Sequence, residues 1–198
     1  ETSSSEEVAN DATLKHVDLT IEQGSLVVVA GSTGSGKSSL VAALLGEIAA
    51  TSSAQVSLQG TAAYVPQKAW CQHATVRENI CAFGKRYERL KYRRVVDCCA
   101  LQPDFALLDK KDKTKIGSRG ITLSGGQHAR INLARACYSD ADIIVMDDPL
   151  SAVDAHVGSH LFDRAILGRR AARRLVRRLG SWRYHWLWPS VGVTRIER

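Results

Sequence analysis

The chain has 198 residues, of which 44% are hydrophobic, enough for one domain with a sizeable core. Its formal net charge of +7 comes from residues 168–198, which carry +8, while the rest of the chain carries −1. A nearly neutral domain excludes a broad electrostatic footprint for nucleic acid, so we expect no nucleic-acid partner. No apolar run approaches the roughly 20 residues of a membrane-spanning helix. Five cysteines without C-x-x-C spacing fit free thiols in a reducing compartment.

The first part of the chain leads to a phosphate-binding motif. Residues 1–11 are rich in serine and acidic side chains, which predicts a disordered leader. Apolar residues spaced along 14–21 favour a half-buried strand, and the apolar run 26–30 predicts a buried parallel strand. GSTGSGKS at residues 31–38 then matches G-x-x-x-x-G-K-[ST], and a helical pattern follows at 39–48.

This strand–loop–helix context is the one in which such a loop binds phosphate. Its glycines let backbone N–H groups curl around the phosphates. Lys37 would place a point charge on the β- and γ-phosphates, and Ser38 can ligate Mg²⁺. The predicted phosphate contacts are Gly31, Ser32, Thr33, Gly34, Ser35, Gly36, Lys37, Ser38 and Ser39.

The middle of the chain holds a second phosphate-binding element. Residues 54–58 and 62–65 are expected to be short strands around a turn, and the periodicity becomes helical from about residue 70 to 123. LSGGQ at residues 123–127 then opens a helix, whose N-terminal N–H groups and serine hydroxyl favour an anion. The predicted contacts here are Ser124, Gly125, Gly126 and Gln127.

A further apolar run, residues 143–146, ends in two aspartates. A carboxylate at the C-terminal end of a buried parallel strand faces the crevice where ligands of open α/β sheets bind. Asp147 is therefore the natural partner of Mg²⁺, directly or through water.

In their order along the chain, these motifs resemble the nucleotide-binding domain of ABC transporters. The phosphate loop, Gln67 within AYVPQKAW, LSGGQ, the Asp147 strand and SAVD at residues 151–154 follow that family's order. The resemblance implies an α/β fold, a P-loop NTPase (RecA-like) parallel-sheet core with an inserted α-helical subdomain at about residues 70–123 and a short antiparallel β part. It covers residues 12–167, which we expect to form the domain.

The resemblance also implies roles for single residues. Gln67 would be the Q-loop glutamine that links the metal and the attacking water to the transmembrane domains. Ser38, Gln67 and Asp147 would hold Mg²⁺ beside ATP, and Asp148 and Gln67 would be catalytic. Two such domains would sandwich two ATP molecules, so LSGGQ would complete a partner's site. The implied partners are a second nucleotide-binding domain and the transmembrane domains of a longer transporter, at the cytoplasmic face of a membrane.

Three details resemble the first nucleotide-binding domain of the multidrug-resistance-associated (C) subfamily. The first is the sequence of the segments TVRENI, LARACYSDADI and DDPLSAVDAHV, and the second is the short interval of 30 positions from Lys37 to Gln67. The third is Asp148, where active sites of the family carry a glutamate. Aspartate is one methylene shorter than glutamate, so its carboxylate lies about an ångström farther from the attacking water. A displacement of that order can cost roughly a hundredfold in rate. The resemblance thus implies a site that binds ATP tightly and hydrolyses it poorly; neutral drift with full activity is the alternative. Trp70 would meet the transmembrane domains or, equally, pack inside the subdomain.

Both ends depart from the family's pattern, so we expect a domain that is incomplete at both ends. No Phe, Tyr or Trp precedes Tyr64 to stack on adenine, which would weaken binding by about 1–3 kcal/mol. From Gly168 the chain turns rich in Arg and Trp, where relatives continue to a hydrophobic strand and a switch histidine. We expect residues 168–198 to lie outside the fold, as the product of a shifted reading frame or, alternatively, as a basic amphipathic helix for an anionic membrane surface.

Two classes of function fit these patterns. In the first, the chain is the ATP-binding domain of an ABC exporter that couples hydrolysis at a two-domain interface to transport. In the second, it is a non-catalytic nucleotide-binding module or a defective fragment. Asp148 favours the second class for the chain's own site, whereas the intact LSGGQ favours the first.

Overall fold

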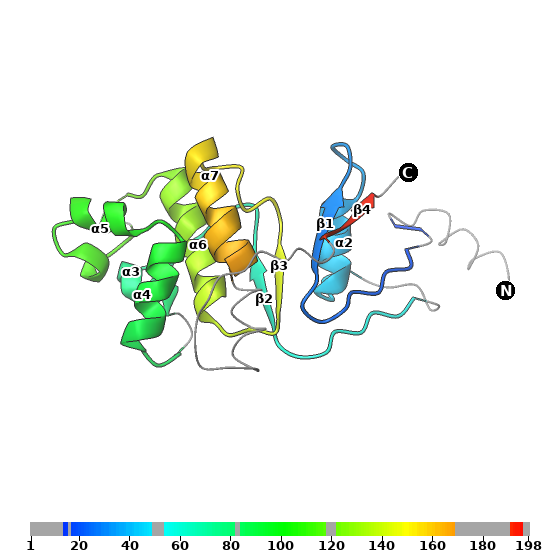
Figure 1. Cartoon of the computed structure of the whole chain (residues 1–198), viewed down its shortest axis with the longest axis horizontal. Helices are drawn as coiled ribbons and strands as arrows, with labels where there is room; N and C mark the ends of the chain where they lie inside the picture. The colour runs from blue at the N-terminus through cyan, green and yellow to red at the C-terminus, as the bar shows by residue number, and fades with distance from the viewer. Residues whose placement is uncertain are drawn as a thin grey trace, which may run out of the picture. The chain divides into compact units, whose positions relative to one another are not determined.

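The computed structural model describes residues 14–15, 17–48, 54–81, 84–117 and 122–168, and the backbone alone of residues 191–195. The chain divides into two compact units, Glu1–Gln59 with Leu179–Arg198, and Gly60–Arg178. In the described residues, each unit has a two-stranded parallel sheet (Figure 1).

The first unit holds a strand, a glycine-rich turn and a helix. β1 (Leu26–Ala30) is a valine-rich run, which favours a strand, and α2 (Lys37–Leu44) follows the turn. The helix buries Leu40. β1 pairs in parallel with β4 (Val191–Arg195), with Leu26 opposite Val191. The parallel strand predicted at residues 26–30 is confirmed, but its predicted burial is wrong, since none of its residues is buried and Val28 is 39% exposed. The helix begins at Lys37.

β4 departs from the expectation that residues 168–198 lie outside the fold. Valine and threonine favour extended chain, and both occur in the segment VGVTR. The strand was not predicted because the composition of the tail is dominated by Arg and Trp. Residues 169–190 and 196–198, and the leader at residues 1–11, lie outside the described residues. The predictions made for those segments stay predictions.

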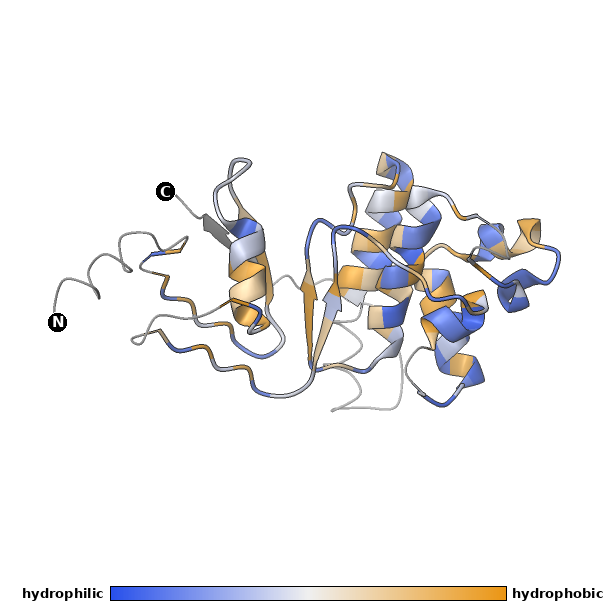
Figure 2. Cartoon of the chain, turned by 180° about the vertical axis from the view of Figure 1, so that it is seen from behind, coloured by the Kyte–Doolittle hydropathy of each residue, from blue (hydrophilic) through white to orange (hydrophobic). Residues whose placement is uncertain are grey.

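The second unit combines a small sheet with a group of helices. β2 and β3 pair in parallel, from Ala62 opposite Ile143 to Val65 opposite Met146. β3 is strongly hydrophobic, whereas α4 mixes hydrophobic and hydrophilic residues around its axis (Figure 2). The elements are β2 (Ala62–Val65), α3 (Val76–Ile80), α4 (Arg89–Cys98), α5 (Gln102–Leu107), the 3-10 turn η1 (Lys111–Lys113), α6 (Gly125–Tyr138), β3 (Ile143–Met146), α7 (Ala155–Leu161) and the π-helical η2 (Phe162–Leu167).

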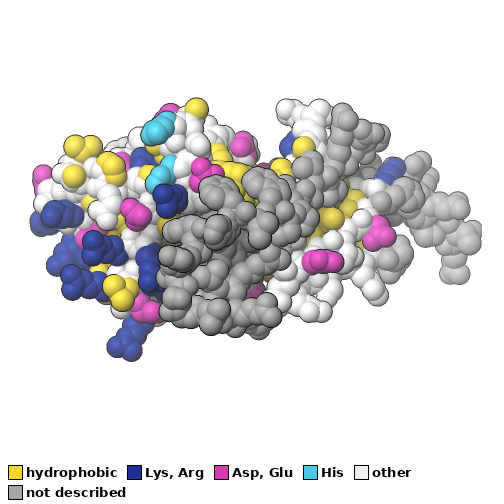
Figure 3. Space-filling model, viewed as in Figure 1, with side chains coloured by type: hydrophobic (Ala, Val, Ile, Leu, Met, Phe, Trp, Pro, Cys, Tyr) yellow, Lys and Arg dark blue, Asp and Glu magenta, His cyan; other side chains and the backbone are white. Residues whose placement is uncertain are grey.

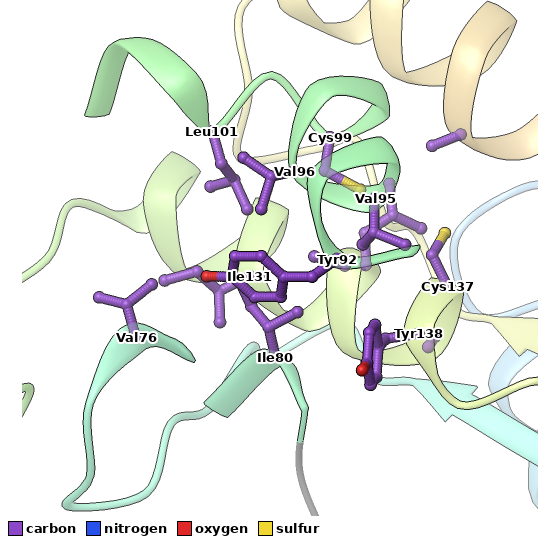
Figure 4. Packing of buried hydrophobic residues seen from close by; sticks show 14 of the residues in the cluster. Val76, Ile80, Tyr92, Val95, Val96, Cys99, Leu101, Ile131, Cys137 and Tyr138 are labelled. Atoms are coloured by element: carbon purple, nitrogen blue, oxygen red, sulfur yellow. The ribbon is translucent and has the colours of Figure 1, made fainter. Parts of the chain in front are cut away.

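α6 is the central helix of this unit and contacts α3, α4, β2 and η2 (Figure 1). Every residue from Ile131 to Tyr138 is buried, as expected for a helix that is covered on all sides. Ile131, Cys137 and Tyr138 of α6 pack with side chains of α3 and α4 (Figure 4). The first two turns of α6 are less buried, so its N-terminus lies at the edge of the core.

The two strands expected at residues 14–21 and 54–58 are not formed. The described residues of both segments lack strand structure, and Ile21 and Val56 are 49% and 51% exposed. Hydrophobic spacing alone does not supply the neighbouring strand that a sheet needs. In the described part of the chain, antiparallel pairing is limited to an isolated bridge between Thr75 and Lys115, so the short antiparallel β part is not found there.

Exposed cations gather on the second unit. Figure 3 shows lysine and arginine side chains over the α4, α5 and η1 end. Arg89, Arg93 and Arg94 on α4, with Lys111 and Lys113 on η1, are exposed. None of the helices in the described ranges is both long and apolar enough to cross a membrane.

Candidate functional site

The phosphate loop in the first unit is shaped by glycine conformations. Gly34 and Gly36 have φ values of 80° and 91°, in the left-handed region that side chains disfavour. Gly36 is the N-cap of α2, and no side chain caps this helix. Lys37 is the first helical residue, and its Nζ donates to the carbonyl oxygens of Gly31 at 2.9 Å and Ser32 at 2.7 Å. The ammonium group therefore lies over its own loop.

Two features of this loop fit a bound phosphate. The Ser35 side chain is buried, and its hydroxyl forms no hydrogen bond with any described residue. Such an orphaned buried hydroxyl is rare unless a ligand or water satisfies it. A Cβ atom at Gly34 would meet nothing within 4 Å, so the loop is open there. The loop residues present thus fit the phosphates of ATP.

The LSGGQ segment forms the start of α6 in the second unit. Ser124 is the N-cap, and its Oγ accepts from the Gln127 N–H at 3.2 Å. Gln127 Oε1 accepts in return from the Ser124 N–H at 2.9 Å, which completes a capping box. The N–H groups of Gly125 and Gly126 belong to the first helical turn, which leaves them outside the internal hydrogen bonds of the helix. With the Ser124 hydroxyl, they can serve an anion.

A partly buried ion pair holds this helix start in place. Arg130 forms hydrogen bonds to both Asp104 carboxylate oxygens, at 2.6 and 3.2 Å, and to the Ala100 carbonyl at 2.6 Å. Both charged side chains are 14% exposed. Gln127 Nε2 donates to the same Asp104 at 3.0 Å. The signature glutamine is therefore held by its cap and by α5 together.

A cavity of about 290 Å³ in the second unit gathers several predicted site residues. It is lined by residues 65–69, the first two turns of α6 and the turn at residues 148–152. Gln67, Gly125 and Asp148 therefore share one cavity, together with His128, which the sequence analysis does not single out. Polar groups converge here from three separate segments, as is usual for a functional site.

The turn after β3 positions the two aspartates differently. The Asp147 N–H donates to the Val65 carbonyl at 2.9 Å, which continues the sheet. Asp148 has a φ of 47°, and its carbonyl accepts from the Ser151 hydroxyl at 3.0 Å. Aspartate is one of the few residues that tolerates this left-handed backbone. Gln67 and Asp148 are exposed, and Asp147 is half-buried.

The three predicted metal ligands are divided between the two units. Ser38 lies in the first unit, whereas Gln67 and Asp147 lie in the second. A hydroxyl, an amide oxygen and a carboxylate are hard oxygen ligands, so their chemistry suits Mg²⁺. Their joint use in one site stays a proposal.

The segment after Gln67 is attached to α6 by buried polar contacts. Asn132 Nδ2 donates to the Trp70 carbonyl at 2.8 Å, and Arg135 Nη2 donates to it at 3.2 Å. Arg135 also lies over the Trp70 ring, 4.1 Å from its centroid. Burial lowers the pKa of the Arg135 guanidinium and raises that of the neighbouring Cys71 thiol, an effect that the Arg135 charge opposes. Trp70 remains 42% exposed, so it is not a core residue.

His128, Asn132, Arg130 and Arg135 were not predicted from the sequence, although Ser124 was. Ser124, His128 and Asn132 follow one another at intervals of four, which places them on one face of a helix. That spacing was a usable signal for the face that looks onto the Gln67 segment. The Arg130–Asp104 pair had no comparable signal, because it joins separate helices.

Comparison with known proteins places this geometry in a family. Residues 14–151 match the family described as ABC transporter. The chain is 51% identical to "ATP-binding cassette sub-family C member 2" of Mus musculus over 156 residues, which are 79% of the chain. It is 50% identical over 161 residues (81%) to "Multidrug resistance protein mrp-7" of Caenorhabditis elegans, and 51% over 154 residues (78%) to "ATP-binding cassette sub-family C member 3" of Homo sapiens.

The chain spans about a tenth of the length of these relatives, since the matched part is 10% of each. The family match covers well over half of the chain and includes the phosphate loop and LSGGQ. The chain belongs to the ABC transporter family, and it carries an ATP-binding domain like those of the subfamily C multidrug-resistance proteins.

Proposed function

We propose that the chain is the first nucleotide-binding domain of an ABC-type exporter and that it uses LSGGQ on ATP held by a second domain. The observation that carries this proposal is the start of α6, where a completed capping box leaves the Gly125 and Gly126 N–H groups to an anion. The chain's own ATP is bound by the Lys37 loop. The two phosphate-binding elements thus serve two different nucleotides.

The residues of the chain's own site bind and orient in this proposal. Lys37 exchanges the Gly31 and Ser32 carbonyls for β- and γ-phosphate oxygens. Ser38, Gln67 and Asp147 would hold Mg²⁺, which would supply positive charge beside the phosphates. The domain extends over residues 12–167. It meets the transmembrane domains of a longer transporter, at the cytoplasmic face of a membrane, through the exposed Trp70 and the half-buried Ala69.

Two measurements separate the two proposed roles: ATP binding reports on the Lys37 loop, and self-association reports on LSGGQ. Lys37→Ala weakens binding of a fluorescent ATP analogue by about a hundredfold, or 2.7 kcal/mol, because a charge-assisted contact is lost. Lys85→Ala, at an exposed lysine outside both motifs, is the matched control. Ser124→Arg leaves this binding intact but abolishes Mg-ATP-dependent self-association, measured by analytical ultracentrifugation. Unchanged ATP binding by Lys37→Ala would contradict the proposal.

The chain's own site hydrolyses ATP poorly because the Asp148 carboxylate is one methylene short. Asp148→Glu raises turnover by about tenfold, measured as phosphate release and compared with Asp148→Asn. Glutamate is less suited than aspartate to a φ of 47°, so the same change lowers stability. If Asp148→Glu gains nothing, the carboxylate length is not the cause.

A non-catalytic nucleotide-binding module is the second candidate function. The aspartate at position 148 is the observation that favours it. In that case the chain binds Mg-ATP, but neither the unchanged protein nor Asp148→Glu releases phosphate above the level of Lys37→Ala. Any turnover that Lys37→Ala abolishes would exclude the purely binding role.

A further inference from the structure

The ring of His128 has a defined tautomer. Its Nδ1 lies 3.1 Å from the Ser124 carbonyl oxygen, one turn earlier on α6. A carbonyl oxygen only accepts, so Nδ1 carries the hydrogen in this contact. In the neutral ring, Nε2 is then an acceptor. No described residue forms a hydrogen bond with His128 Nε2.

His128 lines the same cavity as Gln67, and few other side chains there can still accept a hydrogen bond. Both ends of the Asn132 amide already have partners, since its nitrogen donates to the Trp70 and His128 carbonyls and its oxygen accepts from Arg135. Lys68 only donates. The Ser151 hydroxyl also lines the cavity, but it is already bonded to the Asp148 carbonyl. Apart from Gln67 itself, the side-chain acceptors of the cavity without a described partner are the Asp148 carboxylate and His128 Nε2.

The Gln67 amide has two different ends, and its function requires one particular orientation. If its oxygen faces Mg²⁺, its NH₂ group points away and needs an acceptor. An amide without such an acceptor can turn over and present its nitrogen to the metal. The Asp148 carboxylate is needed for the attacking water under the proposed function, which leaves His128.

We propose that His128 is a positioning residue for Gln67: its Nε2 accepts from the Gln67 NH₂ group and so holds the amide oxygen toward the metal. This inference rests on the proposed function, because it presumes that Gln67 ligates Mg²⁺ of bound ATP. It links the signature helix of the chain to the chain's own nucleotide. The link runs through the second unit alone, since His128 and Gln67 both belong to it.

The test uses the full chain with a fluorescent ATP analogue at a saturating level, and it measures the apparent affinity for Mg²⁺. His128→Leu removes the acceptor and weakens that affinity about three- to tenfold, the worth of one hydrogen bond. His128→Lys, which only donates, has at least the same effect. His128→Gln keeps an acceptor and stays within about twofold of the unchanged chain. His73→Leu is a control histidine outside the cavity.

A double-mutant cycle separates positioning from a general structural role. In a Gln67→Ala background, His128→Leu has no further effect on Mg²⁺ affinity, because the amide that it orients is gone. Thermal unfolding of each variant shows that the fold is kept. Additive effects of the two substitutions, or an unchanged affinity in His128→Leu, would overturn the inference while ATP binding stands. Loss of Mg-ATP binding in the unchanged chain would instead overturn the proposed function and this inference with it.

Discussion

The phosphate loop and the LSGGQ segment solve the same problem in different ways. Both present backbone N–H groups at the start of a helix. The LSGGQ start is fixed by side chains, through the Ser124–Gln127 capping box and the Asp104–Arg130 pair. The phosphate loop has no side-chain cap and depends on left-handed glycines.

The difference indicates where binding requires rearrangement. The LSGGQ donors are held before any partner arrives, so ordering them costs little on association. Under the proposed function, Lys37 in contrast has to give up two carbonyl contacts before it reaches a phosphate. Its net contribution is therefore smaller than that of an unbonded ammonium group, since hydrogen bonds are exchanged rather than gained.

The largest expected effect is the loss of stability when Arg130, which holds the start of α6, is replaced. Arg130→Met leaves the Asp104 carboxylate, 14% exposed, without its cation. Removing one partner of a buried pair costs about 3–5 kcal/mol, and the low end applies here because Gln127 still bonds to Asp104. Urea unfolding measures the loss, with Arg93→Met on the exposed face of α4 as the control.

The same substitution also frees the start of α6. ATP-dependent self-association should weaken in Arg130→Met, whereas ATP binding by the Lys37 loop should not. A variant that loses stability but keeps full association would show that the ion pair does not hold the LSGGQ donors.

Two glycine substitutions sharpen the contrast. Gly34→Ala meets nothing in space but must keep a φ of 80°, so we expect a loss of about 1–2 kcal/mol in unfolding free energy and weaker ATP binding. Gly126→Ala has no such backbone strain, but its Cβ would lie 3.1 Å from the Ala152 carbonyl oxygen. Alanine also favours the helix by up to about 1 kcal/mol over glycine, so stability is nearly unchanged.

The measurements are therefore different for the two glycines. Gly34→Ala is followed by nucleotide titration and thermal unfolding, and Gly126→Ala by self-association, because a shifted turn at Ala152 alters the surface beside LSGGQ. Equal losses of ATP binding in both variants would remove the distinction between the two motifs.

The motifs and their strands could be predicted from the sequence for a physical reason. β1 and β3 are continuous apolar runs. Each is followed directly by residues whose type and spacing indicate their chemistry: the glycine-rich loop before Lys37 and the aspartates at 147 and 148. The spacing of such residues along the chain already defines what they can do. Gln67 and Asp148 were instead predicted from the family resemblance, and the structure places them in one cavity.

What escaped prediction depends on partners that are distant in sequence. The spacing in residues 14–21 suits a strand, but the described residues provide no neighbouring strand for it. Arg135 bonds to the Trp70 carbonyl, 65 positions earlier, and Arg130 pairs with Asp104 on another helix. The spacing of His128 indicates its helix face, but not that this face borders the cavity with Gln67. Local patterns do not contain these contacts.

The smallest expected effect compares two helix caps at the LSGGQ edge of the second unit. Asp154 caps α7, and its Oδ1 accepts from the Val157 N–H at 2.9 Å. This hydrogen bond lowers the pKa of the Asp154 carboxyl. Because the folded pKa lies below the unfolded value of about 3.9, the cap contributes fully above about pH 4 and is lost as the pH falls through the folded pKa.

Asp154→Asn keeps an oxygen acceptor and removes the titration, so its unfolding temperature should approach that of the unchanged chain as the pH falls below about 4. Ser124→Ala, which removes an uncharged cap, should lower the unfolding temperature by the same amount at every pH. Thermal unfolding followed by circular dichroism between about pH 2.5 and pH 7 distinguishes the two cases. A constant offset for Asp154→Asn across this range would mean that the charge of Asp154 adds nothing to its cap. The starts of α6 and α7 would then both be held by hydrogen-bond geometry alone.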